Sequence, residues 1–175
     1  IREWIDKGIE PVPISVNISR EYIHTFDVVG EMLHLVNKYD IPIKLLELEI
    51  TETTDSEGVS DVVQKMKDAG FTMLMDDFGS GYSSLNMLQK TQFDVLKIDR
   101  GFLSEFMESS RGRKIISHTI SMSRDIGLDI IAEGVETPEQ ASFLSDCGCD
   151  SAQGFYYSKP ITQEEFDKML VEVNK

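Results

Sequence analysis

Apolar and polar positions follow two different periods along the chain. Strand-like runs occupy residues 14–18, 45–51, 71–77, 95–98, 128–132 and 152–156. Apolar residues recur at helical spacing over 28–38, 59–69, 83–89, 113–126, a segment after Thr137, and 162–173. Since a helix repeats its buried face every three to four residues and a strand every two, the pattern predicts about six strand–helix units in alternation.

Alternating strands and helices call for parallel strands joined by right-handed crossovers. A doubly wound sheet is one solution, but no Gly-rich phosphate loop follows the first strand. A (β/α) barrel is favoured because polar residues fall at the C-terminal ends of the predicted strands, and in a barrel those ends meet on one face. They are Asn17, Glu49, Asp76, Asp77, Lys97, Asp99, Glu133 and Gln153. So many carboxylates on one face would repel each other, which predicts bound cations.

The length limits how complete this barrel is. A complete eight-unit barrel takes about 250 residues, whereas the chain has 175. We therefore expect a single domain over residues 1–175 that supplies about six of the eight units, with the first strands upstream of Ile1. The first strand of this chain would then have an unpaired edge.

The charge and composition narrow the choice of partners. A net charge of −14, from 31 acidic and 17 basic residues, argues against nonspecific binding to DNA or RNA. An anionic small ligand remains compatible if metal ions, or local Lys and Arg side chains, reverse the charge in one pocket. No apolar run approaches the ~18 residues of a membrane-spanning helix, and no signal-peptide pattern opens the chain. We expect a cytoplasmic domain, whose parent protein could carry membrane segments.

The stretch from Asp76 to Ser84, Asp-Asp-Phe-Gly-Ser-Gly-Tyr-Ser-Ser, carries the strongest chemical signal. Two adjacent carboxylates at a strand end can bridge two divalent cations, which in phosphodiester hydrolysis lie about 3.5–4 Å apart. An acidic turn between a strand and a helix is the alternative interpretation. A protein-kinase origin of Asp-Phe-Gly is excluded because the chain has no Gly-rich loop, His-Arg-Asp segment or Val-Ala-Ile-Lys.

Other strand ends carry further polar groups. Glu49 lies at the end of the second predicted strand, and Glu52 follows at the turn. Lys97 and Asp99 are expected on one face of the fourth strand, where a lysine could orient or help deprotonate a water, or could form a buried ion pair. Residues 133–136 repeat two acids beside a glycine. Each signal is weak alone, and together they converge on one site.

Six segments, in the order found here, resemble the motifs of the EAL family of cyclic di-GMP phosphodiesterases. They are residues 16–19, 49–52, 76–84, 96–99, 132–136 and 153–155. The resemblance implies a TIM-like barrel with one strand reversed, and hydrolysis of one phosphodiester bond of cyclic di-GMP to a linear diguanylate with Mg²⁺ or Mn²⁺. The Glu-Ala-Leu motif that names the family is expected upstream of Ile1. The parent protein could therefore be active where this chain alone is not.

The resemblance also implies roles for individual residues. One metal ion would be held by Asn17, Glu49 and Asp76, and a second by Asp76, Asp77 and Glu133. The implied catalytic residues are Lys97, which would position or activate the attacking water, with Glu133, Glu136 and Asp99. The implied substrate contacts are Gln153, Asp99 and Ser80. The resemblance also implies that the loop after the third strand is braced, and that this loop links dimerisation to metal binding. The residues implied in the bracing are Glu52, Phe78, Gly79 and Gly81.

Three functions stay open on the sequence alone. The first is a metal-dependent phosphodiesterase in bacterial signalling, expected as a homodimer with a sensory or GGDEF-type domain in the parent protein. The second is an inactive receptor for the same dinucleotide, or a dimerisation module. The third is a barrel enzyme of the enolase type, with Lys97 as base toward a carbon acid. Every ligand position that the resemblance implies within this chain is filled, which favours catalysis.

Overall fold

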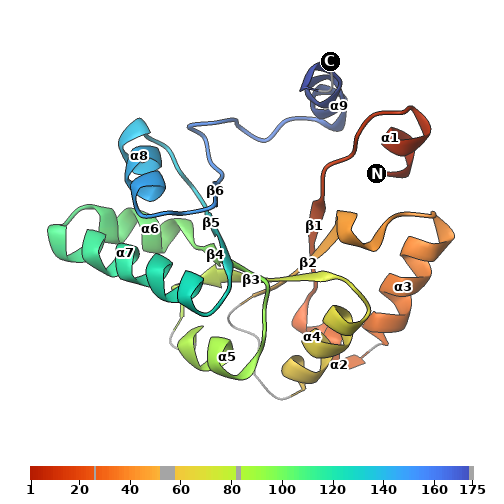
Figure 1. Cartoon of the computed structure of the whole chain (residues 1–175), viewed down its shortest axis with the longest axis horizontal. Coiled ribbons are helices and arrows are strands. Elements are labelled where there is room, and N and C mark those ends of the chain that lie inside the picture. The colour runs from red at the N-terminus through yellow and green to blue at the C-terminus, as the bar shows by residue number, and fades with distance from the viewer. Residues whose placement is uncertain (26, 52–57, 82–83, 174–175) are drawn as a thin grey trace.

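The computed structural model describes residues 1–25, 27–51, 58–81 and 84–173. Strands and helices alternate along the described chain, as the sequence pattern predicts (Figure 1). In chain order they are α1 (Arg2–Asp6), β1 (Ile14–Asn17), α2 (Arg20–Thr25), α3 (Val28–Lys38), the 3₁₀ turn η1 (Ile43–Leu45), β2 (Leu46–Thr51), α4 (Val59–Asp68), β3 (Thr72–Phe78), α5 (Ser84–Lys90), β4 (Val95–Ile98), α6 (Arg100–Met107), α7 (Ser110–Asp125), β5 (Asp129–Ala132), α8 (Pro138–Asp146), β6 (Ser151–Ala152) and α9 (Gln163–Val173).

The strands that the structure describes form one sheet of six, in the order β1-β2-β3-β4-β5-β6. Each pairs with the next in parallel, so the reversed strand implied by the resemblance is not among the described strands. Most of the helices lie around the outside of the sheet (Figure 1). This partial barrel confirms the predicted fold class, because successive parallel strands with helices outside are the arrangement of a (β/α) barrel.

The two faces of the sheet have different chemistry because successive side chains of a strand point to opposite faces. Most outward positions of the central strands are apolar and buried against the helices, and in β2 Leu48 and Ile50 are fully buried. The inward positions near the C-terminal ends are polar, and Glu49, Asp76 and Lys97 are buried there. Burial of each outward apolar side chain contributes about 1.5–3 kcal/mol to folding, and it fixes which residues of the same strand face inward.

Helix α6 was not predicted, and Asp99 caps its first turn. The side chain of Asp99 accepts hydrogen bonds from the backbone N–H groups of Gly101 and Phe102, which begins a helix directly after β4. β4 ends at Ile98, as predicted, and Asp99 is extended just beyond it with its N–H group donating to the Phe78 carbonyl oxygen. The placement of Asp99 on the face of Lys97 stays a prediction. The short length of α6 and the glycine in its first turn hid the helical pattern.

The predicted strand over 152–156 is also wrong beyond its first residue, because β6 covers Ser151–Ala152. The chain turns away at Gly154, whose carbonyl oxygen accepts from the N–H groups of both Tyr157 and Ser158. Gly154 passes so close to Val135 that a Cβ atom there would lie 2.2 Å from the Val135 carbonyl oxygen. Close approach of the two loops therefore ends the sheet early.

Helices α1 and α9, from opposite ends of the chain, lie side by side (Figure 1). The Trp4 ring lies 5.7 Å from the Phe166 ring, and the Trp4 Nε1–H group donates to Asp167 Oδ1 at 2.6 Å. Helix α9 begins with a reciprocal cap, because Thr162 and Glu165 exchange hydrogen bonds. Among the described helices, none is both long enough and apolar enough to span a bilayer.

We expect Gly112→Ala to destabilise the fold by about 1–3 kcal/mol, although alanine is the better helix former by about 1 kcal/mol. Gly112 lies in α7 where it crosses α6, and an added Cβ would lie 2.0 Å from the backbone carbonyl oxygen of Phe106. Urea unfolding would measure the change. Ser121→Ala, at an exposed position of the same helix, should stay within about 0.5 kcal/mol. A Gly112→Ala protein as stable as the parent would contradict the close packing of α6 on α7.

Candidate functional site

Lys97 lies at the centre of a cluster built from the ends of neighbouring strands. Its Nζ atom is 2.8 Å from Glu133 Oε1, 2.9 Å from Glu49 Oε2 and 3.0 Å from Asp76 Oδ1. The side chain of Lys97 is 8% exposed, and that of Glu49 5%. These four side chains come from β4, the residue after β5, β3 and β2. The structure therefore brings together four residues that the sequence analysis placed at separate strand ends.

The charges of this cluster do not balance among its own members. Burial lowers the pKa of Lys97, but hydrogen bonds to Glu133, Glu49 and Asp76 outweigh it and raise the pKa above the usual lysine range. Burial has the largest effect on Glu133 and raises its pKa despite the lowering by Lys97, and the charges of Asp76 and Glu49 add to the rise. Three carboxylates share one ammonium, so the cluster can take up further positive charge.

Asp77 adds a fourth carboxylate through an irregularity of β3. Its φ of +59° is unusual for a residue other than glycine, and its N–H group donates to Asp76 Oδ1 at 3.0 Å. The register between β3 and β4 shifts between Met75 and Phe78. As a result, one oxygen each of Asp76, Asp77 and Glu133 lies within 4.8 Å of the others. Convergent carboxylate oxygens are the donors that Mg²⁺ and Mn²⁺ prefer, so these residues fit the predicted ions.

Asn17 and Gln153 lie at the borders of the cluster. Asn17 is exposed at the end of β1 and pairs in register with Glu49. The Gln153 Nε2 group donates to Glu133 Oε1 at 2.6 Å and orients that carboxylate. Asn17 is the last residue of β1 and Gln153 directly follows β6, so both lie beside the two outermost strands of the described sheet.

The loop after β3 is described as far as residue 81. Phe78 is buried, and its ring meets the Phe102 ring edge-on at 6.1 Å. Gly79 has a φ of +95°, and a Cβ atom there would lie 2.4 Å from the Phe102 ring, so only glycine fits. Ser80 and Gly81 are exposed. Glu52 lies outside the described residues, and its bracing of this loop stays a prediction.

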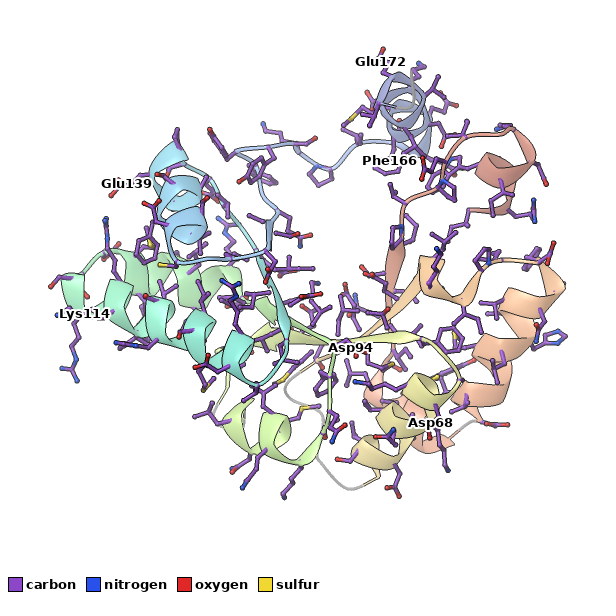
Figure 2. The ribbon with its side chains drawn as sticks, viewed as in Figure 1. Asp68, Asp94, Lys114, Glu139, Phe166 and Glu172 are labelled. Carbon is purple, nitrogen blue, oxygen red and sulfur yellow. The ribbon has the colours of Figure 1, made fainter. Side chains whose placement is uncertain are left out.

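A pocket of about 490 Å³ opens beside Glu133 and Gln153. Arg100 and Glu136 form a charged part of its lining, with Arg100 Nη2 2.7 Å from Glu136 Oε1. Apolar side chains from the C-terminal segment form another wall; they are Phe155, Pro160, Ile161, Phe166 and Met169. Figure 2 shows Phe166 on α9, near α1. The mixed charged and apolar lining of this pocket, and its volume, suit a ligand that has both aromatic and anionic groups.

Arg100 and most of the apolar wall were not predicted from the sequence. Arg100 directly follows Lys97-Ile98-Asp99, so a basic residue at an otherwise acidic strand end was the available signal. The wall depends on how the segment 158–161 leads α9 back over the loops, and no local sequence pattern encodes that path.

Comparison with known proteins gives consistent matches. The profile of the EAL domain family matches residues 1–160. The chain is 34% identical to the bifunctional diguanylate cyclase/cyclic di-GMP phosphodiesterase MucR of Pseudomonas aeruginosa, over 94% of this chain and 24% of that protein. The crystal structure of the EAL domain of Mycobacterium smegmatis DcpA matches with a TM-score of 0.91 and 31% identity, over 99% of this chain and 80% of that chain.

A second solved structure was determined with a nucleotide bound. The PaMucR phosphodiesterase in complex with c-di-GMP matches with a TM-score of 0.85 and 34% identity, over 94% of this chain and 68% of that one. The chain spans about a quarter of the length of the curated relatives it matches.

Proposed function

This chain belongs to the EAL domain family, and we propose that it hydrolyses one phosphodiester bond of cyclic di-GMP to give linear diguanylate. The observation that carries the proposal is the convergence of Glu49, Asp76 and Glu133 around Lys97 at the C-terminal ends of the strands. Active sites of (β/α) barrels are built at that end. The phosphodiesterase name of the MucR relative and the c-di-GMP bound to PaMucR support the choice of substrate.

We assign the divalent ions to the carboxylate cluster. Asn17, Glu49 and Asp76 would hold one ion, and Asp76, Asp77 and Glu133 the other. Mg²⁺ or Mn²⁺ bound there would neutralise the charge that develops on the phosphoryl oxygens. Asp76 belongs to both sets, and the left-handed turn at Asp77 is the backbone feature that lets two consecutive carboxylates face one site.

The remaining polar residues would orient the reactants. Hydrogen bonds to Glu133, Glu49 and Asp76 raise the pKa of Lys97, and Lys97 would position or activate the attacking water. Gln153 holds Glu133 in place. Glu136 would contact the substrate from the adjacent pocket, and its neighbour Arg100 brings positive charge to a lining that a dianionic dinucleotide must approach.

The test is hydrolysis of cyclic di-GMP in Mg²⁺ or Mn²⁺, followed by chromatography of the products. This chain should be compared with a version extended upstream through the two units that would complete an eight-unit barrel. We expect linear diguanylate from the extended version. Binding of cyclic di-GMP without hydrolysis by either version would contradict the enzyme and favour the receptor.

We extend the proposal to the protein that contains this chain. Since the chain spans about a quarter of its curated relatives, and one of them is named as bifunctional, the domain would act beside others that regulate it or make its substrate. Homodimer formation and the bracing role of Glu52 remain predictions.

A further inference from the structure

We propose that Arg100 is a positioning residue, which holds the carboxylate of Glu136 at the edge of the pocket beside the carboxylate cluster. The inference rests on the function proposed above, in which Glu136 contacts the substrate. Arg100 is the first residue of α6 and is separated from β4 only by Asp99, and Glu136 lies in the loop that follows β5. Their ion pair, 2.7 Å between Nη2 and Oε1, therefore joins two neighbouring strand ends.

The backbone of Glu136 is already fixed by the start of α8. The N–H groups of Glu136 and Thr137 donate to Gln140 Oε1 at 2.7 and 3.1 Å, and Gln140 in turn donates its N–H group to the Thr137 side chain. This capping box anchors the loop. The remaining freedom of Glu136 is in its side-chain torsions, and Arg100 is positioned to restrict them.

The stem of Arg100 is itself held in place by Gly134. An added Cβ at Gly134 would lie 2.2 Å from Arg100 Cγ and 2.5 Å from its Cβ. Gly134 also has a φ of +66°, which other residues rarely adopt. The aliphatic part of Arg100 thus lies across the glycine, so that the guanidinium group reaches Glu136 from a fixed direction. An arginine held this way loses less side-chain entropy when it forms the pair.

The position of the pair, rather than its strength, indicates the role. The side chains are 62% and 43% exposed, and such pairs contribute little to stability. Both residues nevertheless line the pocket that also contains Glu133 and Gln153. Arg113 and Glu139 form a comparable exposed pair between α7 and α8. Figure 2 places Glu139 on α8, on the periphery of the molecule, so this pair is a matched control.

The test compares kcat and KM for cyclic di-GMP in the version that hydrolyses it. We expect Arg100→Ala to lower kcat about tenfold, because small misplacements of a reacting group cost one to two orders of magnitude. KM and the melting temperature should change little, and Arg100→Lys should restore most of the rate. In a Glu136→Gln background, Arg100→Ala should cause no further loss, since the two residues act together.

Arg113→Ala makes the test specific. This variant removes the comparable exposed ion pair with Glu139 and should leave kcat unchanged. An active protein in which Arg100→Ala behaves like Arg113→Ala, or in which its effect persists undiminished beside Glu136→Gln, would overturn the positioning role alone. A protein that binds but does not hydrolyse the dinucleotide would overturn the proposed function and this role with it.

Discussion

Replacing Lys97 by methionine is expected to destabilise the protein in EDTA by about 3–5 kcal/mol, the range found when one partner of a buried ion pair is removed. The ammonium group of Lys97 contacts Glu49, Asp76 and Glu133, and its side chain is 8% exposed. Methionine fills a similar volume but leaves these carboxylates facing each other without a cation. Urea unfolding of the two proteins in EDTA measures the difference.

Added Mg²⁺ or Mn²⁺ should remove much of that difference, because the ions would neutralise the same carboxylates. Lys67→Met is the matched control. Lys67 Nζ lies 2.7 Å from Asp94 Oδ1, but the two side chains are 22% and 36% exposed, and such a pair contributes no more than about 1 kcal/mol. A Lys97→Met protein no less stable than Lys67→Met, with or without metal ions, would contradict the central role of Lys97 in the cluster.

Asp76→Asn is expected to lower kcat/KM for cyclic di-GMP by about 10³-fold or more, since metal ions supply several kcal/mol of charge stabilisation. Asp76 is the residue shared by both proposed ion sites, and asparagine preserves its shape while removing the charge. Calorimetric titration with Mn²⁺ should show weaker binding in parallel. Near-normal turnover with unchanged metal content would contradict the assignment.

Asp94→Asn provides the control for the loss of one negative charge. The carboxylate of Asp94 accepts from the Met73 N–H group and pairs with Lys67 at the opposite end of the sheet from the cluster. Asp94 is labelled in Figure 2, just before β4. This variant should lose some stability and retain both Mn²⁺ binding and turnover.

The order of the elements was predictable because most outward side chains of the central strands are apolar and buried. Leu48 and Ile50 are buried on the outward face, so the side chain of Glu49 between them points inward. Parallel pairing then places the C-terminal ends of the strands together. Glu49, Asp76, Lys97 and Glu133 were predicted to lie on one face, and their side chains meet there. Sequence spacing alone thus predicted where the cluster lies.

Features that depend on competition between local and distant contacts were not predictable in this way. Asp99 has the spacing of a strand residue, but its carboxylate caps the two N–H groups that begin α6. Gly154 ends β6 because the loop at Val135 approaches it closely. The ion pair of Arg100 and Glu136 likewise joins segments far apart in the sequence, and the periodic pattern of apolar residues does not predict such a contact.

The contact between α1 and α9 gives the protein a built-in optical reporter. The chain has a single tryptophan, and its indole is buried against Phe166 and hydrogen-bonded to Asp167. Its fluorescence therefore reads the attachment of the C-terminal helix rather than the state of the sheet. A red shift of the emission at denaturant concentrations where the far-ultraviolet circular dichroism is still native would mark release of α9 as a separate step. Since α9 also contributes Phe166 and Met169 to the pocket wall, the same signal would follow the opening of the ligand site.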